Sequence, residues 1–320
     1  MSAAATLRRG VYLDAHLAPF AKWLNGDDVT EILVNRPHEV WIEQAGRFGM
    51  QRQDAPAIDD QLLERLAQQI ARETHQGINR ERPLLAATLP GGARVQIIAP
   101  PATTGHWAMS IRRHRQIVVP LSAYARGAVT ARAAQGWRDA DPMADPVGFL
   151  QRAVAERATV LISGGTSSGK TTFLNALLRE VPAHERIILV EDTPEIRLDH
   201  ANGLGLVAVK GDLGEAKVSV GDLLQAALRM RPDRIVLGEL RGGEAVSFLR
   251  AINTGHPGSF STIHANSPKG ALEHLALMVM QTGLGLSLGE TMLYAKSMID
   301  VVVQLDRSGG VRRISDVMVN

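Results

Sequence analysis

The chain has 320 residues, of which 45% are hydrophobic and 21% charged, an ordinary composition for a folded protein with enough apolar material for two domains. The formal net charge is only +2 and the densest basic cluster, 112–115, is short, so we expect no direct, sequence-specific contact with nucleic acid. The chain has no cysteine, which excludes disulfides and cysteine-ligated zinc.

Residues 1–115 predict a small α+β domain. Apolar residues recur at helical spacing in 17–24 and 61–75, which predicts two helices. Strand-like patterns follow one another as neighbours, and Pro90-Gly91-Gly92 lies between two of them, as in a hairpin loop. Neighbouring strands favour an antiparallel sheet. The strand predictions with named bounds are 30–35, 39–43 and 107–112.

Residues 116–146 change in character. Gly127, Gly136, Pro142 and Pro146 interrupt short alanine-rich stretches, and 121–126 is long enough for one or two helical turns. We interpret this segment as a long linker that is stiff in places.

Residues 147–320 alternate between strand and helix patterns, which predicts a largely parallel sheet with helices on both faces. Ligands in such folds bind at the carboxyl ends of the strands. The predicted strands are 159–163, 186–190, 234–237 and 260–263. The predicted helices are 170–180, 221–230, 242–253, 268–282 and 288–297.

A phosphate-binding motif, G-x-x-x-x-G-K-[ST], occupies 164–171 without a gap, and it lies between a predicted strand and a predicted helix, as the motif requires. In such loops the backbone N–H groups and the helix N-terminus attract phosphate oxygens. Lys170 would add a full charge, and the Thr171 hydroxyl would bind Mg²⁺. The predicted nucleotide-binding residues of the loop are Gly165, Thr166, Ser167, Ser168, Gly169, Lys170, Thr171 and Thr172.

Acidic residues follow two of the predicted strands. Glu191 and Asp192, with Glu195 soon after, end the strand 186–190, and Glu239 follows the strand 234–237. A nucleotide hydrolase needs one carboxylate near its metal and one to position water. Any of these acids alone would be a surface residue or helix cap more often than not, but together with a phosphate loop they indicate a hydrolytic site.

His264 and the arginines leave alternatives open at this point. His264 follows a predicted strand and could face the γ-phosphate, although a lone histidine is usually structural. Among Arg94, Arg112, Arg229, Arg231 and Arg241, the sequence pattern does not choose the one that reaches the phosphates.

Four stretches in order resemble the traffic ATPases of type IV secretion systems, within the secretion and pilus ATPase superfamily. They are GGTSSGKTT at 164–172, LVEDTPEI at 189–196, LRMRPDRIVLGELRGGEA at 228–245 and INTGHPGSFSTIHANSP at 252–268. Similar stretches occur in the N-terminal half and towards the C-terminus, so that the resemblance covers nearly the whole chain. The fold that it implies is α/β, with a C-terminal RecA-like P-loop domain at 147–320.

The resemblance also implies roles for individual residues. Lys170 and Thr171 bind phosphate and Mg²⁺; Glu239 is the water-activating or metal-linked acid; Glu191, Asp192 and Glu195 support it. His264 senses the γ-phosphate, and Arg94 and Arg112 of the N-terminal domain reach the phosphates. ATP and Mg²⁺ are the implied cofactors, with Thr171, Glu239 and Asp192 nearest the metal.

The function implied by the resemblance is that of a hexameric ATPase that drives secretion-pilus assembly or substrate translocation, as in conjugation. The alternative is a nucleotide-gated docking scaffold, in which partners read the shape of the ring. The first residues lack the apolar core of a signal peptide, and no apolar run nears the ~20 residues that span a bilayer. We therefore expect a cytoplasmic homohexamer, peripheral at the inner membrane, that meets other cytoplasmic and inner-membrane subunits.

Overall fold

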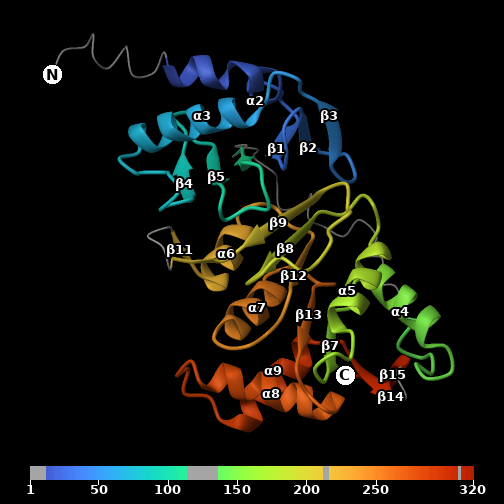
Figure 1. Cartoon of the computed structure of the whole chain (residues 1–320). Helices are drawn as coiled ribbons and strands as arrows, with labels where there is room; N and C mark the ends of the chain where they lie inside the picture. The colour runs from blue at the N-terminus through green and yellow to red at the C-terminus, as the bar shows by residue number, and fades with distance from the viewer. Residues whose placement is uncertain (1–11, 114–135, 212–215, 309–310) are drawn as a thin grey trace, which may run out of the picture. The chain divides into compact units, whose positions relative to one another are not determined.

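The computed structural model describes residues 12–113, 136–211, 216–308 and 311–320, and it contains helices and both antiparallel and parallel strands (Figure 1). These residues form two compact units that are interleaved along the chain. The first combines Met1–His114 with Ala183–Gly238, and the second combines Arg115–Pro182 with Glu239–Asn320. The domain boundaries at 115 and 146 stay a prediction, and most of the predicted linker, including 121–126, lies outside the described residues.

The N-terminal part of the first unit is an antiparallel sheet. Its strand order is β3-β2-β1-β6-β5-β4, and each neighbouring pair is antiparallel, as expected from the run of adjacent strands. The strands are β1 (Val29–Val34), β2 (Glu39–Gln44), β3 (Gln51–Asp54), β4 (Leu84–Thr88), β5 (Arg94–Ile98) and β6 (Ala108–Arg112).

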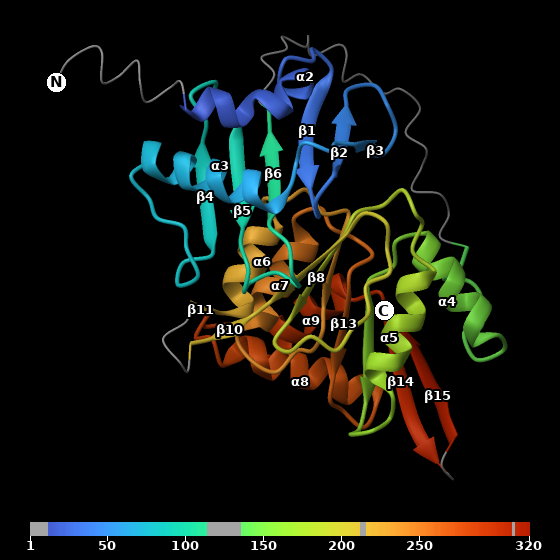
Figure 2. The same ribbon diagram turned by 45° about the horizontal axis from the view of Figure 1, so that its top comes forward.

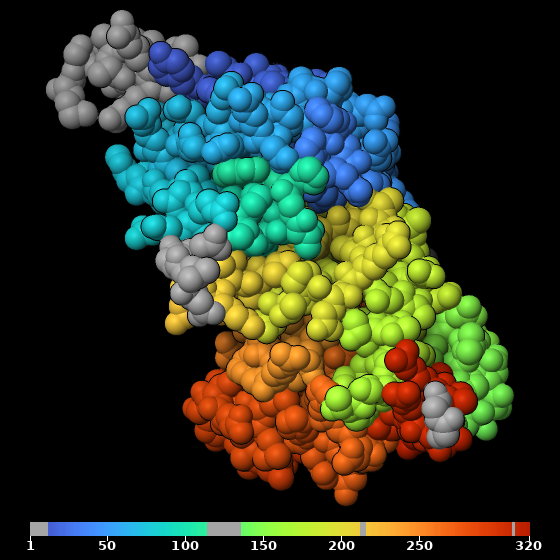
Figure 3. All heavy atoms as spheres, viewed as in Figure 1, coloured from blue at the N-terminus to red at the C-terminus, as the bar shows by residue number. Residues whose placement is uncertain are grey.

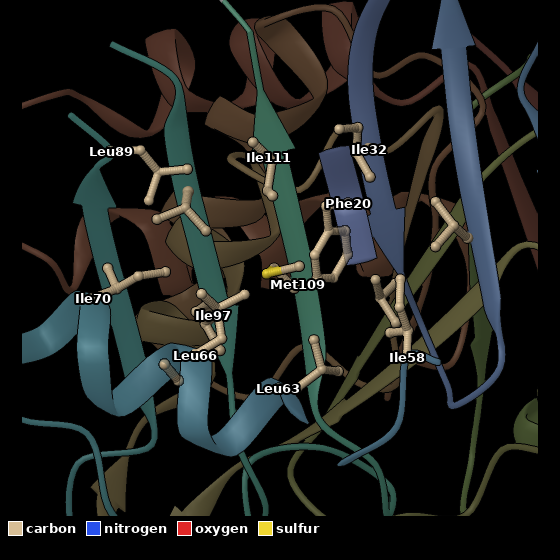
Figure 4. Close-up of a cluster of buried hydrophobic side chains, with 14 of the residues drawn as sticks. Phe20, Ile32, Ile58, Leu63, Leu66, Ile70, Leu89, Ile97, Met109 and Ile111 are labelled. Carbon is tan, nitrogen blue, oxygen red and sulfur yellow. The ribbon is translucent and has the colours of Figure 1, made fainter. Parts of the chain in front are cut away.

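Helices cover one face of this sheet and make its core. The long one is α3 (Asp60–Glu73), which begins where the Asp59 carboxylate accepts the N–H of Leu62 at 2.7 Å, a favourable N-cap. Short helical turns η1 (Ala18–Phe20) and α2 (Ala21–Leu24) precede the sheet. Figure 4 shows α3 laying Leu63, Leu66 and Ile70 against the strands. Burial of each such side chain stabilises the fold by about 1.5–3 kcal/mol.

The remainder of the first unit is built on parallel strands. β8 (Ile187–Glu191) pairs in parallel with both β12 (Arg234–Leu237) and β9 (Gly203–Val207). A two-stranded ribbon, β10 (Val209–Lys210) and β11 (Lys217–Val218), leads to α6 (Val220–Ala227). The parallel strands β8, β9 and β12 are mostly buried and apolar, as parallel strands usually are.

A buried arginine joins this part to the N-terminal sheet within the first unit. Arg186 is fully buried, and its guanidinium donates to the side-chain oxygens of Asn35 and Asn202, at 2.7 Å each, and to the carbonyl of Met230 at 2.9 Å. Burial lowers the pKa of Arg186 to about 9, while Asp233 acts in the opposite direction. Because unpaired buried polar groups are costly, this network specifies one way of joining the two parts.

The second unit carries the phosphate loop on the central strand of a parallel trio. β7 (Val160–Gly164) pairs in parallel with β13 (Phe260–Ile263) and β14 (Val301–Ser308), and β15 (Val311–Val319) runs antiparallel to β14. With the parallel strands of the first unit, this confirms the expected α/β class with largely parallel strands. Figure 2 shows the helices of this unit around its strands. They are α4 (Pro146–Ala155), α5 (Lys170–Arg179), α7 (Glu244–Asn253), α8 (Pro268–Met280) and α9 (Leu288–Met298).

The C-terminal end of the predicted linker is packed against the second unit. Residues 136–145 form turns, and the fully buried ring of Trp137 meets Phe149 of α4 edge-on, with 5.6 Å between centroids. Arg138 lies over the Trp137 ring and pairs with Asp300, next to β14. The part of this segment that the structure describes is therefore anchored within the second unit. Among the described residues, no helix has the length and apolarity needed to cross a membrane.

Candidate active site

The phosphate loop has the backbone that its sequence predicts. It leaves β7 at Gly164 and enters α5 at Lys170, with Ser167 at φ 64° and Gly169 at φ 95°. A side chain on Gly164 would lie 2.4 Å from the hydroxyl of Ser168 and 2.9 Å from the carbonyl of Leu305. Glycine is therefore needed at 164 for close approach and at 169 for both approach and conformation.

Lys170 is folded back onto the loop. Its ammonium group donates to the carbonyls of Gly164 at 3.1 Å and Gly165 at 3.3 Å, and only 8% of the residue is exposed. Burial lowers the pKa of Lys170, and the charge of Glu239 offsets part of this effect. A desolvated ammonium group beside a helix N-terminus is well placed to exchange these carbonyls for phosphate oxygens.

His264 and Glu239 lie beside Lys170 in the same unit. The Lys170 ammonium nitrogen is 3.2 Å from Nδ1 of His264, and Nε2 of His264 is 2.7 Å from Oε1 of Glu239. That oxygen of Glu239 is buried and has no aligned hydrogen-bond donor, although the imidazole is close to it. The structure therefore brings together three residues that lie in separate motifs of the sequence.

Arg241 completes this cluster, and the sequence had left its role open. Its Nε donates to Oε2 of Glu239 at 2.6 Å. The backbone N–H groups of Arg241 and Gly242 are held by the carboxylate of Glu244, in the first turn of α7. Glu239 thus has one oxygen occupied by a cation and one facing the histidine. Arg241 follows Glu239 by two residues, and this short spacing was the sequence signal that could have singled out Arg241.

The backbone after His264 is fixed from neighbouring elements. The carbonyl of Ala265 accepts from the side chain of Gln304 on β14 at 3.2 Å and lies 3.5 Å from the Ser163 hydroxyl on β7. The carbonyl of His264 lies 2.9 Å from Nδ1 of His274 on α8. Sequence reasoning missed Gln304 and Ser163, because strand pairing over more than 100 residues brings them to this place.

The loop residues predicted to bind nucleotide differ in accessibility. Thr166, Ser167 and Thr172 are exposed, whereas Ser168 is buried and its hydroxyl has no partner among the described residues. Thr171 is half-buried, at the first turn of α5 next to Lys170. Such a hydroxyl suits Mg²⁺, which takes few ligands from the protein and the rest from phosphates and water. In the described ranges, no group of three acidic or histidine side chains forms a metal cluster of its own.

The acids that follow β8 belong to the first unit. Glu191 is buried, and its Oε1 accepts the N–H groups of Glu195 and Ile196, both at 2.9 Å. Burial raises the pKa of Glu191, and these two hydrogen bonds lower it. Asp192 pairs with Lys210 at 3.3 Å, and the side chain of Glu195 is exposed. In this geometry, Glu191 holds the loop 192–196 in shape.

The two arginines predicted from the N-terminal domain also lie in the first unit, on neighbouring strands. Arg94 of β5 is directly opposite Arg112 of β6. Arg112 donates to the buried carboxylate of Glu31, whereas Arg94 is exposed. Burial raises the pKa of Glu31, and the Arg112 guanidinium lowers it. The structure therefore brings the two arginines together as a pair.

A phosphate loop between a parallel strand and a helix, with an acid and a histidine beside its lysine, defines the class of P-loop nucleotide hydrolases. Comparisons with known proteins narrow this class. The family model described as type II/IV secretion system protein matches residues 14–308. A type IV secretion system protein PtlH homolog of Bordetella bronchiseptica is 43% identical, over 97% of this chain and 95% of that protein. The VirB11 protein of Brucella suis is 36% identical, over 98% and 91%.

A solved structure agrees with these relatives. The VirB11 ATPase of the Brucella suis type IV secretion system, determined in complex with sulphate, superposes with a TM-score of 0.90 at 34% identity, and covers 99% of this chain and 96% of that one. The chain belongs to the type II/IV secretion system protein family. It is a nucleotide-binding ATPase, and the resemblance seen in its four motifs is confirmed.

Proposed function

We propose that this ATPase works as a homohexameric motor that energises type IV secretion, by pilus biogenesis, substrate translocation or both. The relatives named above are type IV secretion proteins, and this chain matches each of them over almost its whole length. The observation that carries the proposal is the contact of Lys170, His264 and Glu239, which joins a phosphate ligand, a candidate sensor and a candidate base.

In the proposed reaction, Lys170 moves from the loop carbonyls to the β- and γ-phosphates of ATP. The hydroxyl of Thr171 would hold Mg²⁺, which would neutralise charge on the phosphates. Glu239 orients water and accepts its proton while the water oxygen bonds to the γ-phosphorus; the bond from phosphorus to the bridging oxygen breaks, and ADP leaves with that oxygen. Asp192 would be a further ligand or water partner of the metal. His264 changes its contacts when the γ-phosphate leaves. Arg94 and Arg112 neutralise charge on the phosphates, and Glu191 and Glu195 shape the neighbouring loop.

The proposed setting is the cytoplasmic face of the inner membrane, where the ring meets other cytoplasmic and inner-membrane subunits of the secretion system. The relatives' names support only the secretion-system part of this setting, since each relative is named as a type IV secretion system protein. Domain closure on ATP and opening after hydrolysis is the motion expected of a clamp of this type.

Two substitutions separate a motor from a nucleotide-gated scaffold. Lys170→Ala removes the phosphate ligand, whereas Glu239→Gln retains the size of the side chain and removes the candidate base. In a secretion-competent host, we expect Glu239→Gln to bind ATP and to assemble, but to fail in hydrolysis and in secretion. Secretion by a Glu239→Gln protein that shows no measurable hydrolysis would favour the scaffold instead.

A further inference from the structure

The C-terminal hairpin β14–β15 reaches the phosphate loop. Leu305 of β14 is paired with Gly164, the first residue of the loop motif. Further along the hairpin, the side chain of Arg312 on β15 lies against Gly169, the residue before Lys170. A Cβ atom on Gly169 would be 2.7 Å from Cδ and 3.1 Å from Nε of Arg312. The hairpin is at the surface of its unit (Figure 3), and Arg312 is exposed.

Among the residues that the structure describes, none neutralises the charge of Arg312. The residue directly opposite it on β14 is a second arginine, Arg307, and directly opposite residues of an antiparallel pair share a face. Neither side chain has a hydrogen bond or ion pair with any residue that the structure describes. Like charges in this arrangement are destabilising.

Other arginines of the chain show that this arrangement is not general. The next residue on the same strand, Arg313, points to the other face and pairs with Asp306 at 3.1 Å. In the first unit, Arg112 also faces an arginine across two strands, but it has the carboxylate of Glu31. Arg307 and Arg312 therefore form an uncompensated cationic pair, and one of them touches a loop built to bind anions.

We propose that Arg312 is a further nucleotide-binding residue, which donates to the phosphate oxygens of the nucleotide held by the phosphate loop, and that Arg307 strengthens the positive field there. The inference rests on the nucleotide site described above. A guanidinium binds phosphate well because its N–H groups form a fixed fork. A bound phosphate would also relieve the repulsion between the two arginines.

The test measures equilibrium binding of fluorescent ADP and of pyrophosphate to the full chain. We expect Arg312→Ala to weaken both by about 10-fold or more, since a hydrogen bond to a charged group contributes about 1.5–3 kcal/mol. Arg313→Ala is the matched control, because it removes an equal charge from the neighbouring position on the other face; we expect it to bind like wild type. Arg312→Lys retains the charge without the fork, and we expect an intermediate affinity.

Thermal unfolding of the same proteins separates a ligand contact from a structural role. Without ligand, Arg312→Ala should melt at or above the wild-type temperature, because a repulsion is removed; with ADP, its stabilisation should be smaller than that of wild type. Unchanged affinities for ADP and pyrophosphate in Arg312→Ala would overturn the inference. A lower affinity of Arg312→Ala for ADP with an unchanged affinity for pyrophosphate would also overturn it, because that result would indicate that Arg312 stacks on the base instead of binding phosphate. If wild type binds neither ligand, the proposed nucleotide site itself is wrong, and Lys170→Ala would then give the same absence of binding as wild type.

Discussion

The side chains of Lys170 and His264 make contacts within the protein that a bound phosphate group would replace. Lys170 satisfies its ammonium group with two loop carbonyls and lies next to His264. Both loop carbonyls belong to the glycines that begin the phosphate motif. Exchange of these contacts for phosphate oxygens would release His264, so that one event at the phosphates alters both the lysine and the histidine.

The carboxylate of Glu191 gives a pH-dependent prediction at the residue scale. Burial raises its folded-state pKa, so its contribution to stability is full below its ordinary pKa and is lost as the pH rises through the folded-state value. Glu191→Gln retains an oxygen that can accept the N–H groups of Glu195 and Ile196. We expect the free energy of unfolding of Glu191→Gln, relative to wild type, to increase between pH 4 and pH 8, as measured by urea denaturation.

Exposed Glu195→Gln, in the same loop, controls for the loss of a negative charge. A difference between Glu191→Gln and wild type that decreases as the pH rises would contradict this account. It would mean that the hydrogen bonds to Glu191 dominate over its burial.

At the scale of elements, the phosphate loop depends on contacts with strands that are distant in sequence. Gly164 is close to Leu305 of β14, and Gly169 is close to Arg312 of β15. The two glycines differ from Gly165, where an added Cβ would meet nothing within 4 Å. The local motif therefore contains glycines that are required for different reasons.

Alanine substitutions test this difference. Gly169→Ala should lower the free energy of unfolding by about 1–2 kcal/mol, because an L side chain is strained at positive φ. The loss should be larger if the side chain of Arg312 does not move away from the added methyl group. Gly165→Ala is the control, and we expect it within about 0.5 kcal/mol of wild type. In an Arg312→Ala background, Gly169→Ala should be less destabilising, as a double-mutant cycle would show. An equal effect in both backgrounds would mean that only the backbone matters.

The elements with regular apolar patterns could be predicted from the sequence. The helices at 61–75 and 268–282 and the buried strands at 159–163 and 260–263 are present within a few residues. Other elements give weak patterns. β3 is polar and alternates only between half-buried and exposed, and most of β15 is exposed. Both are stabilised by pairing with a neighbouring strand rather than by an apolar face of their own.

The grouping of residues in the candidate site was predictable where they belong to local motifs, and not where strand pairing alone brings them together. The phosphate loop, Glu239 and His264 follow from local motifs and from the family resemblance. Arg312 lies against Gly169, and Gln304 and Ser163 lie at the carbonyl of Ala265, only because β14 lies beside β7. No local spacing reports that contact, since β7 and β14 are separated by more than 130 residues.

At the scale of the whole molecule, each compact unit is made from two separate stretches of chain. Lys170, Glu239 and His264 lie in one unit, whereas Glu191, Asp192, Arg94 and Arg112 lie in the other. In a ring, neighbouring subunits can complete or order one another's sites, which is why the proposed motor should depend on assembly.

The most direct test of this account is steady-state ATP hydrolysis by wild type and Lys170→Ala across a range of protein concentrations, with molecular mass determined on the same samples. We predict that the rate per subunit rises as hexamers form and that Lys170→Ala abolishes hydrolysis. A well-folded wild-type hexamer that hydrolyses no ATP, or a rate per subunit that stays constant from monomer to hexamer, would contradict the proposed ring motor.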